Sequence, residues 1–337
     1  MQPIPAIEAT ELSGAPQFQR EVLELCRPVV LRHLVSAWPV VHAATRSDED
    51  LRDYLLRFDQ GGQADAFVGE RVIAGKYYYR DGLEGFNFER RRTSFADALK
   101  SMVATKSDAA AATMYFGSLP VQDFLPGFAA ANVLSVLPPH VAPRIWLGHA
   151  ANVSAHFDAF DNVACVVSGK RRFTLYPPEA IDRLYVGPLD NTMAGQPVSL
   201  AAAAPRDDAR YPRFAEVRDL ALSAELGPGD ALYIPKLWWH QVESLSPFNA
   251  LVNYWWDAFA AGPDAPYVSL LLSMIAIAER PPGEREAWKA FFDHYVFRTQ
   301  GHPLQHLPES QHGMLGPLKP DNYAKIRAFV MHRLRGG

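Results

Sequence analysis

The sequence predicts a mostly-β fold with flanking helices, and three stretches of different texture lead to this prediction. Short apolar runs separated by Gly, Pro, Asn and Asp fill the middle of the chain, at 144–147, 163–167, 171–176, 231–234, 240–244 and 250–255. Such a series is typical of a β-sandwich or barrel. Helical and strand signals alternate before it, and helical spacing returns after Trp256. We therefore expect an α/β region at 1–120 that packs on the barrel, the barrel at 121–260, and a helical region at 261–337.

The outer regions can be divided into elements by periodicity and capping residues. We expect N-terminal helices at 17–26, 47–58 and 94–105, strands near 28–33, 66–73, 76–80 and 113–117, and C-terminal helices at 267–279, 284–297 and 321–335. Ser47 is a suitable N-cap, and the acids Asp48, Glu49 and Asp50 follow it in the first turn, where the helix dipole favours negative charge.

Composition excludes some functions. The net charge of −4 comes without a basic stripe, which disfavours nucleic acid as the main partner. No apolar run reaches the ~20 residues that a membrane-spanning helix needs. The two cysteines, Cys26 and Cys165, stand in apolar surroundings, so we expect buried free thiols in a reducing compartment. The first residues show no secretion signal, and we expect a cytoplasmic protein.

A candidate metal site begins with His156 and Asp158, whose spacing puts both side chains on one face of a strand. His240, which follows the apolar strand 231–234, is the best third ligand. Two histidines and one carboxylate form the facial triad of non-haem Fe(II) oxygenases, which leaves positions open for a chelating 2-oxo acid and dioxygen. The alternative is a hydrogen-bonded His–Asp pair near a turn.

Arg171 is the second candidate, because strand alternation places it with Phe173 and Leu175 on the apolar face. A buried cation needs an anion, and the distal carboxylate of 2-oxoglutarate fits a guanidinium. The alternatives are an internal salt bridge, or a shift of strand phase that turns Lys170 inward.

Three more polar residues stand on or beside the apolar strands. Asn162 and Asn253 could each donate an amide N–H to the co-substrate or to a metal-bound oxygen, or they could cap strand ends. Tyr115 could offer its hydroxyl to the same carboxylate as Arg171, or it could be an ordinary core tyrosine.

Two separated blocks, in this order, resemble the JmjC or cupin-like oxygenases. The first runs from His156 through Asn162 to the segment 169–178, and the second runs from Gly229 to His240, with Asn253 closing. Together they span 146–256. Among these enzymes, the blocks look like the asparaginyl hydroxylase that acts on hypoxia-inducible factor.

The resemblance implies a double-stranded β-helix (jelly-roll) core, 2-oxoglutarate as co-substrate, and Fe(II) held by the catalytic ligands His156, Asp158 and His240. It places around the co-substrate Tyr115, Asn162, Arg171 and Asn253. Two departures stand out. That hydroxylase has a lysine at the position of Arg171, so Arg171 and the adjacent Lys170 both stay candidates for the distal carboxylate. Ser154 is a weak equivalent of a threonine that contacts the co-substrate there.

The expected reaction is hydroxylation of a protein or peptide side chain, with succinate and CO2 as co-products. The alternatives are N-methyl-lysine demethylation, hydroxylation of a small molecule, or a non-redox cupin-type isomerase or binding module. An aromatic rim that keeps water from the iron could include Tyr77, Tyr79, Phe86, Trp239 and Trp255, although core packing would explain the same residues. The C-terminal helices, with stripes such as 270–272, suggest a homodimer by resemblance, or packing against the barrel.

Overall fold

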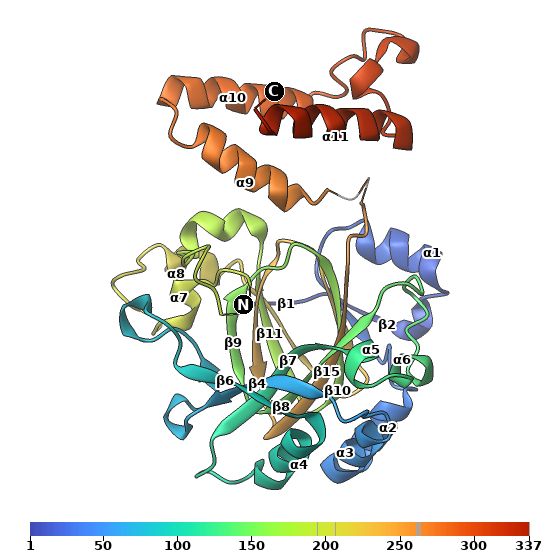
Figure 1. The fold of residues 1–337 in the computed structure, drawn as a ribbon, viewed down its shortest axis with the longest axis vertical. Helices are drawn as coiled ribbons and strands as arrows, with labels where there is room; N and C mark the ends of the chain where they lie inside the picture. The colour runs from blue at the N-terminus through green and yellow to red at the C-terminus, as the bar shows by residue number, and fades with distance from the viewer. Residues whose placement is uncertain (194, 206, 261, 263, 337) are drawn as a thin grey trace. The chain divides into compact units, whose positions relative to one another are not determined.

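The computed structural model describes residues 1–337 except Ala194, Arg206, Ala261, Pro263 and Gly337. The chain forms two compact units, Met1–Ala258 and Phe259–Gly337. The first unit contains both sheets (Figure 1). The predicted boundary at residue 120, inside the first unit, stays a prediction.

Two sheets make up the first unit. The six-stranded sheet has the order β1 (Gln2–Pro3), β12 (Leu222–Leu226), β11 (Arg171–Tyr176), β14 (Trp239–Ser244), β9 (Asn152–His156) and β5 (Lys76–Tyr77). The nine-stranded sheet has the order β2 (Ala6–Glu8), β3 (Val29–Arg32), β13 (Ala231–Ile234), β10 (Asp161–Ser168), β15 (Phe248–Trp256), β8 (Pro143–His149), β7 (Thr113–Pro120), β4 (Gln63–Gly69) and β6 (Phe88–Ser94).

Apolar side chains from both sheets meet in one interior. Val166 of β10 and Leu251 of β15 pack there with Phe173 and Leu175 of β11. The alternate residues of β10, such as Val163 and Cys165, belong to a second core on the outer face of the nine-stranded sheet. The predicted mostly-β jelly-roll with flanking helices is confirmed, and strand alternation decides which side chains reach its interior.

Helices cover the outer face of the nine-stranded sheet. They are α2 (Pro39–Arg46), α3 (Asp48–Leu56), α4 (Phe95–Thr105), α5 (Val121–Phe124) and α6 (Phe128–Ala131), and they contribute to the second core (Figure 1). The helix α3 begins where predicted, since the Ser47 hydroxyl accepts a hydrogen bond from the Asp50 amide at 2.9 Å. Short helices α7 (Leu200–Ala203) and α8 (Phe214–Arg218) lie in the connection between β11 and β12.

The N-terminal region does more than pack on the barrel. Its strands extend both sheets, with β2, β3, β4, β6 and β7 in the larger one and β1 and β5 in the smaller one. The first predicted helix is split into α1 (Ala15–Phe18) and a π-helical turn, Gln19–Leu23. Cys26 follows this turn with φ 47° and is exposed, so the expectation that both thiols are buried is wrong for Cys26; Cys165 is buried.

The second unit contains the three predicted helices, α9 (Pro266–Ile277), α10 (Pro282–Tyr295) and α11 (Pro320–Leu334). Each has proline in its first turn, where a missing N–H costs no hydrogen bond. Neither α9 nor α10 buries any described residue, although both carry large apolar side chains. Among the described residues, no helix has the length and apolar character needed to cross a membrane.

Candidate metal centre

The three predicted metal ligands lie together at one end of the smaller sheet. His156 is the last residue of β9, and it pairs with His240 on the neighbouring antiparallel strand β14. Asp158 lies just past the end of β9 rather than on it, and its carbonyl accepts the amide of Leu237 at 2.8 Å. One ligand atom from each of the three residues falls within 4.8 Å of the others.

Backbone carbonyls orient both imidazole rings. Nδ1 of His156 lies 2.9 Å from the carbonyl of Ser154, and Nδ1 of His240 lies 3.0 Å from that of Trp238. A ring that donates Nδ1–H keeps the lone pair of Nε2 for a metal. Burial, helped by the nearby His156, lowers the pKa of His240 to about 4, so His240 is neutral at pH 7. Two imidazoles and a carboxylate fit an Fe(II) ion with open positions.

Trp255 makes a contact to this centre that the sequence did not suggest. Its indole Nε1–H donates to Oδ2 of Asp158 at 3.1 Å, and the same oxygen lies 3.7 Å from Nε2 of His240. We expected Trp255 only as part of an aromatic rim. The one sequence signal is its position on β15, two residues after Asn253, because such spacing places both side chains on one face.

Arg171 is a buried cation with no hydrogen-bond or ion-pair partner in the part of the chain that the structure describes. Its side chain is on the strand face of Phe173 and Leu175, and only 9% of the residue is exposed. Its Nε has no hydrogen-bond partner, and burial alone lowers its pKa to about 10, without help from a neighbouring charge. Lys170, the alternative, is exposed. The structure therefore brings Arg171, and not Lys170, into the jelly-roll interior, where an unpaired cation calls for an anionic ligand.

The two candidate asparagines contact each other. Nδ2 of Asn253 donates to Oδ1 of Asn162 at 3.1 Å, and Oδ1 of Asn253 accepts the indole N–H of Trp146 at 2.8 Å. Each polar atom of Asn253 thus has a partner within the protein, whereas Nδ2 of Asn162 has no acceptor among the described residues and is the freer amide donor of this pair. No local pattern indicates Trp146, since this contact joins residues far apart in the chain.

A cavity of about 80 Å³ opens beside the metal ligands. Its lining includes His156, Asp158 and Ser154 together with the aromatic rings of Tyr77, Tyr115 and Trp255. Tyr115 stacks on Phe67 with ring centroids 4.8 Å apart, and burial raises the pKa of its hydroxyl, which stays protonated. An apolar wall around a few polar groups is the usual form of a small-molecule site.

Three of the predicted rim residues do not line this cavity. Trp239 is 1% exposed and packs against Phe157, because it is adjacent to His240 on β14 and points to the other face of the strand. Tyr79 and Phe86 belong to a neighbouring aromatic cluster, where the Tyr79 hydroxyl donates to the carbonyl of Asn191. Only Tyr77 and Trp255 of that set reach the cavity.

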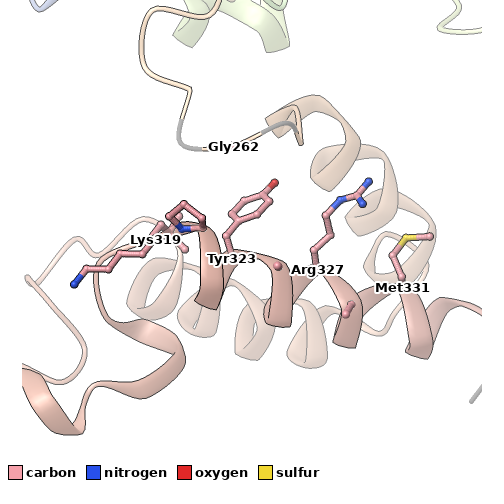
Figure 2. Close-up of a pocket in the computed structure, with 9 residues that line it drawn as sticks. Gly262, Lys319, Tyr323, Arg327 and Met331 are labelled. Atoms are coloured by element: carbon pink, nitrogen blue, oxygen red, sulfur yellow. The ribbon is translucent and has the colours of Figure 1, made fainter.

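The second unit has a larger hollow, of about 580 Å³, along α11. Figure 2 shows Tyr323, Arg327 and Met331 along its wall. The Tyr323 hydroxyl donates to Asp264, and Nε of Arg327 lies 3.1 Å from the same carboxylate. The described residues that line it include no His, Cys, Asp or Glu, so the chemistry is expected in the smaller cavity of the first unit.

The chain is similar to known cupin-like and Jumonji C proteins. A family model described as a cupin-like domain matches residues 15–262. Jumonji C domain-containing protein 5 of Drosophila melanogaster is 28% identical over 268 residues, 75% of this chain and 60% of that protein. HSPB1-associated protein 1 of Bos taurus is 26% identical over 291 residues, 81% of this chain and 57% of that protein. The human bifunctional peptidase and (3S)-lysyl hydroxylase JMJD7 is 34% identical over 149 residues, 38% of this chain and 45% of that protein.

This chain spans less than two thirds of the length of each of these relatives.

Proposed function

Because the chain belongs to the cupin-like domain family, we propose that it is an Fe(II)- and 2-oxoglutarate-dependent oxygenase that hydroxylates a protein or peptide side chain. The observation that carries this proposal is Arg171. An unpaired, buried guanidinium stands in the same interior as a His–Asp–His cluster, and a dicarboxylic co-substrate accounts for both features.

The residues have distinct tasks in this proposal. Fe(II), when bound with 2-oxoglutarate and dioxygen, would supply the hydroxylating chemistry, with succinate and CO2 as co-products. His156, Asp158 and His240 hold the metal. Arg171 binds the distal carboxylate of the co-substrate, and Asn162 donates an N–H to its oxygen atoms. Two further candidates, Tyr115 and Ser154, line the cavity beside the metal ligands.

The aromatic side chains Tyr77, Tyr115 and Trp255 keep water away from the reacting centre. A protein substrate is supported by the human relative whose name includes (3S)-lysyl hydroxylase. N-methyl-lysine demethylation and hydroxylation of a small molecule use the same metal site and stay alternatives. A non-redox cupin-type isomerase or binding module is disfavoured, since it gives no role to Arg171.

Anaerobic titration with Fe(II) and 2-oxoglutarate tests the proposal. We expect a weak visible charge-transfer band that is lost in His156→Ala and in Arg171→Met. The matched control is Arg172→Met, because Arg172 is on the outer face of the same strand and pairs with Glu225 at 2.6 Å. Absence of the band in folded wild-type protein would refute the co-substrate assignment.

Mass spectrometry then separates the reactions. Incubation of lysate proteins and peptides with enzyme, iron and 2-oxoglutarate should add one oxygen atom to the substrate. Loss of a methyl group would instead support demethylation, and oxidation confined to the small-molecule fraction would support that alternative.

A homodimer through the C-terminal helices is a further proposal. Ile275 on α9 is 83% exposed and Phe291 on α10 is 59% exposed, while neither helix has a described residue that is buried. Large apolar side chains in this number are unusual on the surface of a monomer and typical of an interface. The name of one relative, HSPB1-associated protein 1, also suggests that a protein partner of another kind could cover them.

The proposed location is the cytoplasm. Both cysteines are unpaired, and Cys26 exposes its thiol at the surface. Free thiols of this kind are stable in a reducing compartment. Cell fractionation with an antibody to the native protein tests this.

A further inference from the structure

Three side chains on adjacent strands form a hydrogen-bonded chain that leads to the co-substrate region. Trp146 on β8 stands opposite Leu251 of β15, so Asn253 is its diagonal neighbour. Asn253 in turn stands opposite Ala164 of β10, which makes Asn162 the next diagonal neighbour. The donor–acceptor distances along this chain are 2.8 Å from Trp146 to Asn253 and 3.1 Å from Asn253 to Asn162.

The direction of the chain follows from the chemistry of its first member. An indole N–H can only donate, so the oxygen of Asn253 has to face Trp146. The NH2 group of Asn253 then faces Asn162, whose oxygen has to accept. This leaves the NH2 group of Asn162 without an acceptor among the described residues, on a residue that is 5% exposed and lies on the interior face.

Without the indole N–H, this direction is lost. A 180° turn of the Asn253 amide would then cost no hydrogen bond, and Asn162 could turn with it. Asn162 would present an oxygen instead of an N–H to the co-substrate, and an amide oxygen repels a carboxylate where an N–H binds it.

We infer that Trp146 is a positioning residue for co-substrate binding: its indole N–H holds the Asn253–Asn162 amides in the one direction that offers an N–H to an oxyanion. The inference rests on the proposed function, since 2-oxoglutarate is the anion concerned. It assigns Trp146 a role through Asn162 and not through contact with the metal ligands.

The neighbourhood of Trp146 permits a clean substitution. Its ring packs edge-to-face on Trp255 with centroids 6.0 Å apart. Phenylalanine keeps an aromatic ring at this position and removes the N–H together with the five-membered part of the indole, which lines the cavity. Trp38→Phe is the matched control, because it also replaces an indole by a phenyl ring and removes an N–H, one that donates to the carbonyl of Val133 at 2.8 Å, outside this hydrogen-bonded chain.

The experiment measures the Kd of 2-oxoglutarate for the full chain loaded with Mn(II) in place of Fe(II), by titration calorimetry, in wild type, Trp146→Phe, Asn162→Ala and the double variant. We expect about tenfold weaker binding in Trp146→Phe, the size of one lost hydrogen bond to a charged group. The double variant should bind no more weakly than Asn162→Ala, since Trp146 acts through Asn162. Mn(II) affinity, followed by electron paramagnetic resonance, should be unchanged in Trp146→Phe. The Kd of 2-oxoglutarate should be unchanged in Trp38→Phe.

Unchanged 2-oxoglutarate binding in folded Trp146→Phe would overturn the inference. So would a double variant in which the increases in Kd caused by Trp146→Phe and Asn162→Ala multiply, because the two residues would then act independently. If Trp146→Phe does not fold, Asn253→Leu interrupts the same chain at its middle and is expected to weaken binding equally, again only where Asn162 is present. Wild-type protein that holds Mn(II) but binds no 2-oxoglutarate would refute the proposed function itself, which is a different result from normal binding in the variant.

Discussion

The indole N–H of Trp255 donates to the carboxylate of Asp158 at 3.1 Å and so joins the two sheets at the metal centre. Trp255 belongs to β15 of the nine-stranded sheet, whereas Asp158 follows β9 of the six-stranded sheet. Since Asp158 lies beyond the end of its strand, sheet hydrogen bonds do not fix its side chain. The indole bond restricts the rotation of this carboxylate before a metal arrives.

Removing that hydrogen bond should weaken metal binding. Trp255→Phe keeps an aromatic side chain but removes the indole N–H, so Asp158 loses a partner that orients it, a change that typically costs 10- to 100-fold in metal affinity. We expect about tenfold weaker Mn(II) binding in an electron paramagnetic resonance titration. Trp146→Phe is the control and should bind Mn(II) like wild type. Equal affinities for wild type and Trp255→Phe would show that Asp158 is held by other means.

Arg171→Met should abolish binding of 2-oxoglutarate without lowering the free energy of unfolding. Burial of an unpaired guanidinium opposes folding, so the metal-free variant is expected to be as stable as wild type or more stable. In the presence of Mn(II), 2-oxoglutarate at a hundred times its Kd should raise the free energy of unfolding of wild type by about 3 kcal/mol. In Arg171→Met, 2-oxoglutarate should add nothing to the stabilisation by Mn(II) alone. Urea unfolding with and without co-substrate measures both. A variant that is several kcal/mol less stable would point to an internal partner for Arg171.

Prediction of the fold from the sequence succeeded where alternation and turn residues agree. The strands β11 and β13 were located to the residue, since apolar and polar residues alternate along β11, and β13 is a short continuous apolar run that follows the turn at Gly229. The strand β12 was missed although apolar and polar residues alternate along Leu222–Leu226, because this short run is mostly half-exposed and includes only two large apolar side chains. The strand β6 includes Arg90, Arg91 and Arg92, and its pairing with β4 outweighs the low strand propensity of such a run.

The structure brings the three predicted metal ligands together, but it does so through contacts that no sequence pattern indicates. Strand phase was enough to turn Arg171 inward, since it depends only on neighbours in sequence. The bond between Trp146 and Asn253 depends on the register of β8 against β15, which no local pattern contains. Trp239 illustrates the reverse case: its aromatic character suggested a rim, but adjacency to His240 on one strand sends it to the opposite face.

The buried imidazole of His240 should make the metal-free protein sensitive to acid. An unfolded histidine has a pKa near 6.5, whereas in the folded chain the pKa of His240 is about 4. Between these values the unfolded state binds more protons, so stability falls as the pH is lowered from about 6.5 to about 4, by up to about 3 kcal/mol. Urea unfolding at several pH values across this range gives the free energy of unfolding. This free energy should depend less steeply on pH in His240→Gln than in wild type. His140→Gln is the control, since His140 is exposed. If the free energy of unfolding of His240→Gln depends on pH as steeply as that of wild type, His240 is not the cause of the acid sensitivity.

Charge on the helical unit should abolish self-association. Ile275 and Phe291 are among the most exposed apolar residues of α9 and α10, and a carboxylate in a buried interface loses its hydration without a partner. We expect wild type to sediment as a dimer and the double variant Ile275→Asp, Phe291→Asp to sediment as a monomer at the same concentration, with an unchanged helical signal. Val72→Asp, at a residue that is 83% exposed in the first unit, should leave the dimer intact. A monomeric wild type would instead mean that a different protein, or nothing, covers these helices.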